Sequence, residues 1–176
     1  MPHTIRTERL LLRQPVARDA TAFTRHCNDF NVTRMTARWP SSFTEDFARA
    51  RFVRAAAWDA MKDTLFSILF QGECIGLIGL HANEEGTGKL GYMIGMSVSG
   101  QGLMTEAVTA VCRHGFAVMG LNTITADHYL DNPASGRVLQ KAGFECMGYD
   151  PPVWSEARGR ADPGTKYALT RERYGR

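Results

Sequence analysis

Hydrophobic residues along the chain fall into short runs that follow the period of a strand or of a helix. Residues 9–15 predict a strand, and residues 17–28 predict a short helix. Residues 29–42 have no clear period, whereas 44–61 form the clearest amphipathic helix pattern, with Thr44 as its N-cap. The apolar face of this predicted helix consists of Phe47, Ala50, Val53, Ala57 and Met61.

Three strand-like runs follow, because residues 65–80 break at 71–73 into a hairpin and residues 89–98 add a third strand. The second half of the chain predicts a helix at 104–119, a strand at 123–130, a helix at 132–141 and strands at 144–150 and 166–174. Residues 151–164, rich in Pro, Gly and Arg, predict a long loop. This order predicts an α/β (α+β) fold: a mixed sheet of about seven strands flanked by about four helices.

Composition favours one domain over residues 1–176, because 44% hydrophobic residues suit a single substantial core. The net charge of +3 is mild and the arginines are dispersed, which argues against direct nucleic-acid binding but allows a phosphate-bearing small molecule. No signal-peptide pattern or membrane-spanning run is present, so we expect a cytoplasmic protein without a membrane partner. The cysteines lack metal-ligand spacing and are expected to be buried, reduced thiols, with no bound metal: Cys27, Cys74, Cys112 and Cys146.

Two closely spaced glycines, Gly100 and Gly102, separate the strand predicted at 89–98 from the helix predicted at 104–119. Glycine is costly inside regular structure, so the pair marks either an ordinary turn or a close approach of a ligand to the backbone. A strand that passes through "SGQG" into a helix presents unpaired backbone N–H groups and the positive helix end, as phosphate sites do. Taken alone, the glycines favour the ordinary turn, because neither a Walker lysine nor a full GxGxxG is present.

A second motif changes that balance. The stretches "LGYMIGMSVSGQGLMTEAV" and "YLDNPASGRVLQKAGFECMGY" together resemble the GNAT superfamily of acetyl-CoA-dependent N-acetyltransferases, particularly the branch that acetylates ribosomal-protein N-termini. "TERLLLR", the hairpin and "YALTRERY" extend the resemblance over most of the chain. Ser99 and Met104 depart from the family's pyrophosphate motif, which usually begins with Gln or Arg and ends with Gly or Ala.

The resemblance implies a single-domain GNAT-like fold in which the central strand and its neighbour splay apart around the thioester. It also implies that the backbone of Met96 and Val98 pairs with the pantetheine arm and that the glycine turn wraps the pyrophosphate. Ser135 would be the catalytic donor to the thiol, although a plain helix-start role for it stays open. The implied acetyl-CoA residues are Met96, Val98, Gly100, Gln101, Gly102, Leu103, Met104, Thr105, Asn132 and Ser135.

The sequence leaves the general base open among His128, His81 and Glu156. Tyr92 is expected to be a core aromatic residue, and Glu106 to steady the start of its helix. The candidate walls of an acceptor pocket are Phe30, Met35, Trp39 and Trp154.

The expected partner is an amine acceptor, either a peptide N-terminus or a small molecule, and a homodimer is compatible with this prediction. Two alternatives to an enzyme are a non-catalytic acyl-CoA-binding regulatory module and a nucleotide-binding α/β protein. Turnover with amines and a preference for coenzyme A over ATP or NAD separate them from an N-acetyltransferase.

Overall fold

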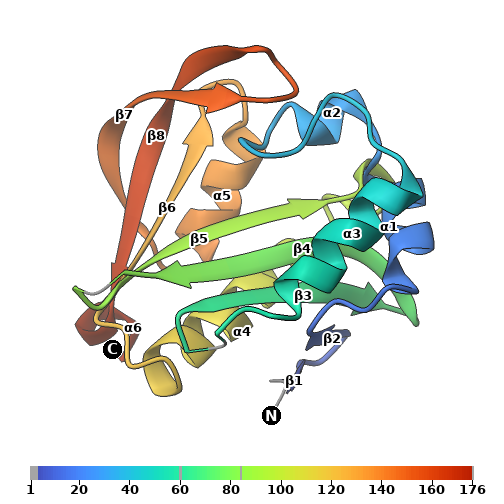
Figure 1. Cartoon of the computed structure of the whole chain (residues 1–176). Helices are drawn as coiled ribbons and strands as arrows, with labels where there is room; N and C mark the ends of the chain where they lie inside the picture. Colours follow the sequence, from blue (N-terminus) through green and yellow to red (C-terminus); the bar gives the residue numbers. More distant parts are fainter. Residues whose placement is uncertain (1–3, 60, 84, 176) are drawn as a thin grey trace.

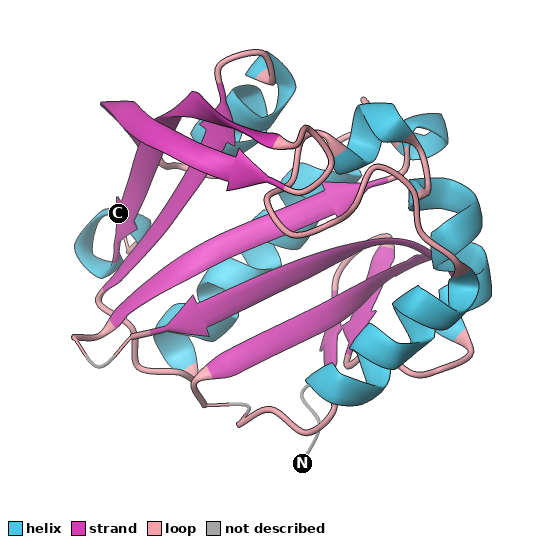
Figure 2. Cartoon of the chain, turned by 45° about the horizontal axis from the view of Figure 1, so that its top comes forward, coloured by secondary structure: helices cyan, strands magenta, loops and turns pink. Residues whose placement is uncertain are grey.

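The computed structural model describes residues 4–59, 61–83 and 85–175. Within them, eight strands form one mixed sheet, flanked on both faces by helices (Figures 1 and 2). The strands are β1 (Thr4–Arg6), β2 (Leu10–Arg13), β3 (Asp63–Phe70), β4 (Glu73–Ala82), β5 (Thr87–Ile94), β6 (Thr123–Tyr129), β7 (Glu145–Ser155) and β8 (Arg160–Thr170). The helices are α1 (Asp19–Cys27), α2 (Phe30–Thr33), α3 (Glu45–Ala55), α4 (Leu103–Ala117), α5 (Pro133–Lys141) and α6 (Arg171–Tyr174). The predicted fold class is confirmed, with one more strand and two more helices than expected.

The sheet runs in the order β1-β2-β3-β4-β5-β6-β8-β7 and is antiparallel except between β5 and β6. These two strands pair only at three positions, from Thr87↔Thr123 to Lys89↔Thr125. Beyond them β5 continues beside β4 as far as Ile94, while β6 continues beside β8 as far as Tyr129. The two halves of the sheet therefore part like a V, with α5 behind the gap and α2 near its open end (Figure 1).

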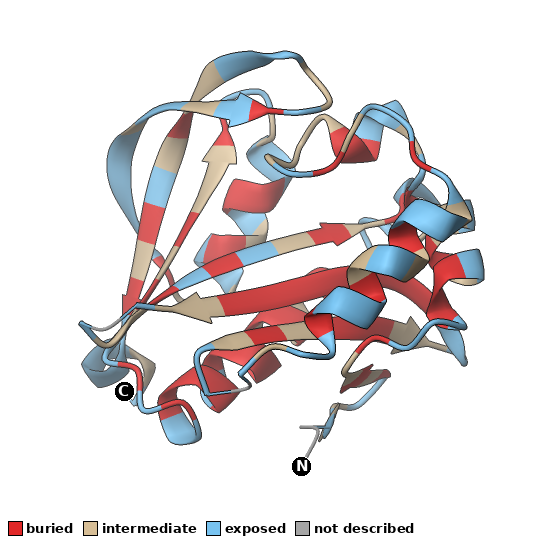
Figure 3. Cartoon of the chain, viewed as in Figure 1, coloured by how far each residue is buried: buried red, intermediate tan, exposed pale blue. Residues whose placement is uncertain are grey.

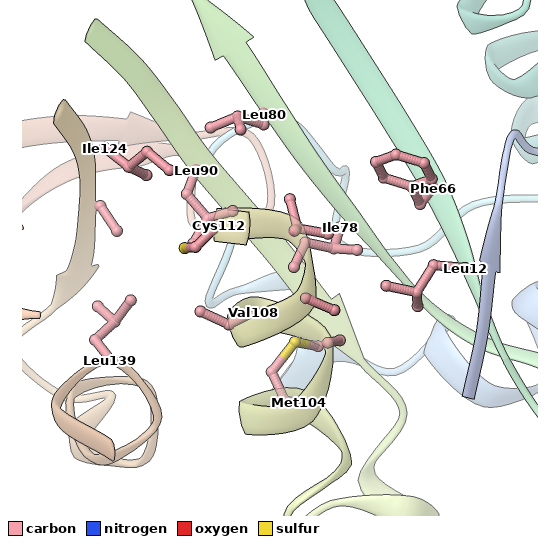
Figure 4. Packing of buried hydrophobic residues seen from close by; sticks show 14 of the residues in the cluster. Leu12, Phe66, Ile78, Leu80, Leu90, Met104, Val108, Cys112, Ile124 and Leu139 are labelled. Carbon is pink, nitrogen blue, oxygen red and sulfur yellow. The ribbon is translucent and has the colours of Figure 1, made fainter. Parts of the chain in front are cut away.

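Two hydrophobic cores hold the helices on opposite faces of the sheet. The larger core joins α4 and α5 to the sheet and includes fully buried Leu12, Ile78, Leu80, Val108 and Leu139 (Figure 4). The smaller core joins α1 and α3 to β4 and β5 and includes Phe23, Trp39, Phe43, Phe52 and Leu77. Removing a large apolar side chain of this kind from water contributes about 1.5–3 kcal/mol, so both layers are firmly attached.

Helix α3 is shorter than predicted and buries a different face. It ends at Ala55, and Ala60, inside the predicted 44–61 span, lies outside the described residues. The buried stripe is Ala48, Phe52 and Ala55, whereas Phe47, Val53 and Met61 are exposed. Figure 3 shows that α3 has both buried and exposed parts. Phe52 fixes this face because its ring packs against the buried ring of Phe23, with the ring centroids 5.3 Å apart.

The C-terminal region also differs from the prediction, since most of the expected 151–164 loop belongs to the β7–β8 hairpin. Pro151 and Pro152 are tolerated because β7 is the outer strand and its pairing shifts register between Asp150 and Val153. The predicted terminal strand stops at Thr170, whose side chain caps α6 by accepting a hydrogen bond from the Arg173 N–H at 3.3 Å.

Three of the four cysteines are buried as expected, but Cys146 is exposed on the outer strand β7. Burial raises the pKa of Cys74 to about 11 and that of Cys112 to about 12, so both thiols stay protonated near neutral pH. None of the helices in the described part of the chain is long and apolar enough to cross a membrane.

Candidate active site

The segment that leaves β5 is a turn and not a continued strand. β5 ends at Ile94, and Met96–Val98 form a short 3₁₀ helix, so the prediction of a strand through residue 98 is wrong. Gly95 lies against α1, where an added Cβ would come within 2.7 Å of the His26 carbonyl oxygen. The glycine therefore permits close helix contact, and the strand-like backbone that the resemblance assigned to Met96 and Val98 is absent.

Gly100 and Gly102 then bring the chain into α4 with φ values of 78° and 79°, a conformation that favours glycine. Gly102 is the N-cap residue and offers no side chain to the helix. Among the described residues, none accepts a hydrogen bond from the first three helical N–H groups, those of Leu103, Met104 and Thr105. The start of this 15-residue helix therefore presents free donors and the positive end of its dipole.

The two departures from the family motif are accommodated locally. The Ser99 hydroxyl donates to the Met96 carbonyl at 3.0 Å, which places it within the 3₁₀ turn. The Met104 side chain is buried in the larger core (Figure 4), so only its backbone faces the turn.

Arg9, which the sequence analysis did not single out, holds the turn from the side. Its guanidinium donates to the Gln101 carbonyl at 2.9 Å and to a Glu106 carboxylate oxygen at 2.7 Å. Glu106 also accepts from the Thr7 hydroxyl at 2.6 Å, so it steadies the helix start by binding the N-terminal segment. Burial alone would raise the pKa of Glu106, but the hydrogen bonds from Thr7 and Arg9 lower it.

The start of α5 forms the opposite side of this region. Asn132 is its N-cap and accepts a hydrogen bond from the Ser135 N–H at 3.3 Å. The Ser135 side chain is buried, and its Oγ lies 2.7 Å from the hydroxyl of Tyr92 on β5. Burial raises the pKa of Tyr92 although the bond to Ser135 opposes this, so the phenol stays protonated. Tyr92 thus packs its ring against the core, as expected, and its hydroxyl shares a hydrogen bond with the Ser135 hydroxyl in which either group can be the donor.

Two cavities meet where β5 and β6 part. The first, of about 480 Å³, lies beside α3 and the segment that precedes it, and the second, of about 730 Å³, contains the glycine turn and the start of α5. Both are bordered by Met35, Thr36, Leu90, Gly91, Tyr92, Met93, Asp127 and His128. All the residues that the sequence analysis assigned to acetyl-CoA border the second cavity except Gln101, whose carbonyl is held by Arg9.

The three candidate bases lie in different places. His128 borders both cavities, His81 borders only the first and is bound to Asp63 at 2.7 Å, and Glu156 is exposed and borders neither. The four residues expected to form the walls of an acceptor pocket also lie in different places. Met35 and Trp39 line the first cavity, whereas Phe30 and Trp154 line neither and are exposed, which corrects their expected role.

Three cations border the second cavity, and one of them, Arg34, is paired with Asp131. The other two, Arg137 and Lys141, lie four residues apart on α5. Both are exposed, and neither pairs with a carboxylate of the described residues. Their spacing of four residues puts them on one side of α5. The sequence alone does not show that this side of α5 lies beside the glycine turn. Across the described ranges, no group of three or more His, Cys, Asp or Glu side chains is arranged to hold a metal ion.

This architecture is shared with solved acetyltransferase structures. The crystal structure of a GNAT-family acetyltransferase from Bacillus anthracis is 25% identical, with a TM-score of 0.82 over 97% of this chain and 99% of that one. The structure described as RimL, a ribosomal L7/L12 alpha-N-protein acetyltransferase in complex with coenzyme A, has a TM-score of 0.83 but only 19% identity. It covers 96% of this chain and 98% of that one, and shows likeness of fold alone. The chain therefore has the fold of these acetyltransferases.

Sequence comparison gives the family. The family described as "Acetyltransferase (GNAT) domain" matches residues 9–145, and the chain belongs to this family. The uncharacterized N-acetyltransferase YoaA of Bacillus subtilis is 30% identical over 148 residues, covering 82% of this chain and 84% of the relative. The [ribosomal protein uS5]-alanine N-acetyltransferase of Escherichia coli is 42% identical, but over only 60 residues, 34% of this chain and 31% of that protein.

Proposed function

We propose that this acetyltransferase is an acetyl-CoA-dependent N-acetyltransferase, which transfers the acetyl group to a primary amine where β5 and β6 part. The observation that carries the proposal is the uncapped start of α4, which borders the same cavity as buried Ser135. A ligand of this cavity needs an anionic part for the helix start and a reactive part near Ser135. Coenzyme A thioesters combine these two features.

The residues around the second cavity fit such a ligand. The free N–H groups of Leu103, Met104 and Thr105 suit a diphosphate, and nothing lies within 4 Å of the position of a Cβ on Gly100. Met96 and Val98 border the path from this turn to the parted strands, so we assign them contacts with the pantetheine arm without strand-like pairing. Asn132 is assigned both the cap of α5 and a cofactor contact.

Bound acetyl-CoA supplies an activated acetyl group on a thiol leaving group. Ser135 holds a hydroxyl proton at the cleft and is assigned the role of donor to the departing sulfur, with Tyr92 replacing that proton across 2.7 Å. A free thiol has a pKa of about 8.5, so the sulfur is already a fair leaving group and the help required is modest.

The amine must lose a proton before or during its attack, and we place the proton acceptor at His128. The Nδ1 of His128 lies 2.7 Å from the Tyr129 carbonyl oxygen, which can only accept, so Nδ1 carries the ring proton. Its Nε2 is then free to accept a proton, and its distance of 3.5 Å from the Tyr167 hydroxyl leaves that contact weak. Only His128 among the three candidates borders both cavities.

Titration calorimetry with coenzyme A, together with thiol release from acetyl-CoA in the presence of amines, tests the proposal. Ser135→Ala is expected to lower kcat about tenfold and to change the coenzyme A Kd much less, because the donor that it removes acts mainly during transfer. Tyr92→Phe should also lower kcat, because it removes the hydroxyl that replaces the Ser135 proton. The control is Ser41→Ala, because Ser41 is an exposed serine that borders neither cavity.

Three outcomes would contradict the proposal in different ways. Coenzyme A binding without turnover on any amine would favour the non-catalytic acyl-CoA-binding module. Binding of ATP or NAD in preference to coenzyme A would favour a nucleotide-binding protein. An unchanged kcat for Ser135→Ala would leave that serine with the structural role of a helix-start residue.

A further inference from the structure

Arginines supply most of the charged side chains along the wall of the first cavity. Arg38, Arg51 and Arg54 all border it, and none forms an ion pair with a carboxylate of the described residues. Lys89 borders the same cavity and is paired with Asp127, the only carboxylate along its described lining. The cavity therefore carries a large excess of positive charge on the side opposite to the glycine turn.

Arg51 is held in place by contacts with neighbouring residues. Its guanidinium lies over the ring of Trp39, 4.8 Å from the centroid, and donates to the Arg38 carbonyl at 3.3 Å. Burial lowers the pKa of Arg51, and the like charges of Arg54 and Arg38 lower it further. A cation that is held in one place and repelled by its neighbours is ready to bind an anion.

On helix α3, only the arginines that border the cavity lack a carboxylate partner among the described residues. Arg49, two residues before Arg51, is paired with both Glu45 and Asp46 and does not border the cavity. Glu45 and Asp46, the acidic residues in the first turn of α3, thus pair with the arginine that lies outside the cavity. The arginines that face the cavity remain available to a ligand.

The cavity is also covered on the β7–β8 side. The Ser155 hydroxyl donates to the Thr36 carbonyl at 2.8 Å, the Glu156 N–H donates to the Ala37 carbonyl at 3.0 Å, and Arg158 donates to the Arg34 carbonyl at 2.5 Å. These bonds tie the hairpin to the segment after α2. A volume of about 480 Å³ with this cover suits a small molecule better than a polypeptide.

Building on the proposed N-acetyltransfer, we propose that the acceptor is a small primary amine that also carries a carboxylate or a phosphate group. Arg51 binds that anionic group, with Arg54 and Arg38 as supporting charges, and the amine lies toward the parted strands. The arginines also disfavour the ammonium form of the acceptor, which increases the fraction of neutral amine that can react.

Matched pairs of acceptors test the inference at saturating acetyl-CoA. Glycine is compared with glycinamide, phosphoethanolamine with ethanolamine, and a neutral peptide amide stands for a polypeptide N-terminus. With kcat/KM expressed per concentration of neutral amine, the anionic member of at least one pair is expected to be preferred by about tenfold or more. The two pairs distinguish a carboxylate from a phosphate.

Arg51→Gln is expected to remove most of this preference, because kcat/KM should fall about tenfold for the anionic acceptors and much less for the neutral ones, while Arg51→Lys should retain part of it. The coenzyme A Kd should stay unchanged, because Arg51 does not border the second cavity. Arg49→Gln is the matched control, because it deletes the same charge from the same helix outside the cavity. Calorimetry of glycine and phosphoethanolamine with the parent and with Arg51→Gln provides a measurement that does not depend on turnover.

Several results would overturn the inference while the proposed function stands. One is a kcat/KM for the neutral acceptors and the peptide amide that equals or exceeds that for the anionic acceptors. Another is an equal loss of kcat/KM for both members of a pair in Arg51→Gln. The third is that calorimetry detects no binding of either anionic amine. Failure to bind coenzyme A, with no thiol release for any amine, would instead overturn the proposed function.

Discussion

The two cavities that meet between β5 and β6 are built in different ways. The second cavity owes its chemistry to the backbone, since Gly100 and Gly102 turn the chain and the start of α4 presents unpaired N–H groups. The first owes its chemistry to side chains, among them Arg51 from α3 and Asp127 from β6. A backbone site needs one short segment in one conformation, whereas a side-chain site needs several distant segments to be placed together.

This contrast predicts that the two sides tolerate different changes. Most side chains of the glycine turn can vary while its backbone conformation is kept, as Ser99 and Met104 illustrate. On the arginine side, one change of charge alters which ligand fits and leaves the fold in place. Cofactor binding and acceptor choice should therefore separate experimentally.

The largest effect is expected from Gly102→Val. Its φ of 79° is unfavourable for a β-branched residue by roughly 1–3 kcal/mol, and relief of that strain would rotate the N–H groups away from the ligand. We expect coenzyme A affinity to fall about 100-fold, equivalent to about 2.7 kcal/mol. Calorimetry on folded protein measures this.

Gly72→Val is the matched control for this change. Gly72 has a φ of 86° in the β3–β4 hairpin, with nothing within 4 Å of an added Cβ, and borders neither cavity. It should carry a similar strain and stability cost without altering coenzyme A affinity. Equal affinity for the parent and Gly102→Val would contradict a backbone site at this turn.

A second, smaller effect is expected on the helix layer that supports the arginine side. Asp19, the first residue of α1, is buried and accepts hydrogen bonds from Arg13 at 2.7 Å and from Ser67 at 2.8 Å. Asp19→Asn leaves Arg13 without its charge partner, and because Arg13 is partly exposed we expect a loss of about 2 kcal/mol in unfolding free energy. The KM for the acceptor should rise while the coenzyme A Kd stays unchanged.

The pH dependence of stability identifies the cause of that loss. Burial alone would raise the pKa of Asp19, but hydrogen bonds from Arg13, Val16 and Ser67 hold it below its usual value. The carboxylate therefore contributes stability that is fully present above about pH 4 and is lost as pH falls through the lower folded-state pKa. Urea unfolding from pH 7 to pH 3 should show the parent and Asp19→Asn converging in acid. A constant difference would contradict this account.

Much of the fold could be predicted because its signals are local. Asn132, Pro133 and Gly143 bound α5 by cap chemistry within one segment, and the hairpin at 71–73 lies where the sequence breaks. The buried face of α3 could not be predicted, because contact with Phe23 on another helix decides it. Parts of β7 and β8 were predicted as strands, but the outer part of their hairpin was not, because Pro151 and Pro152 indicate a loop unless the strand is known to be outermost.

The candidate site divides in the same way. The turn at Gly100–Thr105 and the Asn132–Ser135 helix start are continuous motifs, so the sequence alone singled out both segments, and both border the second cavity. The Tyr92–Ser135 contact joins residues 43 positions apart, and Arg9 reaches Gln101 across 92 positions. No local pattern carries such information. The sequence does not reveal the arginines of the first cavity, because residues 29–42 lack a period and the hydrophobic pattern of α3 predicts the wrong buried face.

The smallest effect sharpens the comparison, because Arg137 and Lys141 give the backbone-built cavity a side-chain component. Both are exposed, so solvent and salt weaken their attraction for a phosphate. We expect the double variant Arg137→Ala/Lys141→Ala to raise the coenzyme A Kd only about three- to fivefold, roughly 0.7–1 kcal/mol, and to reduce its salt dependence. A control double variant, Arg6→Ala/Lys166→Ala, removes the same charge at exposed positions that border neither cavity.

Dephospho-coenzyme A, which lacks the 3′-phosphate, shows what these two cations bind. If they bind that group, the parent should prefer coenzyme A and the double variant should bind both forms equally. A loss of 100-fold or more in the double variant would mean that side-chain charge, and not the backbone at Gly102, dominates this cavity. The division between a backbone-built cofactor side and a side-chain-built acceptor side would then be wrong.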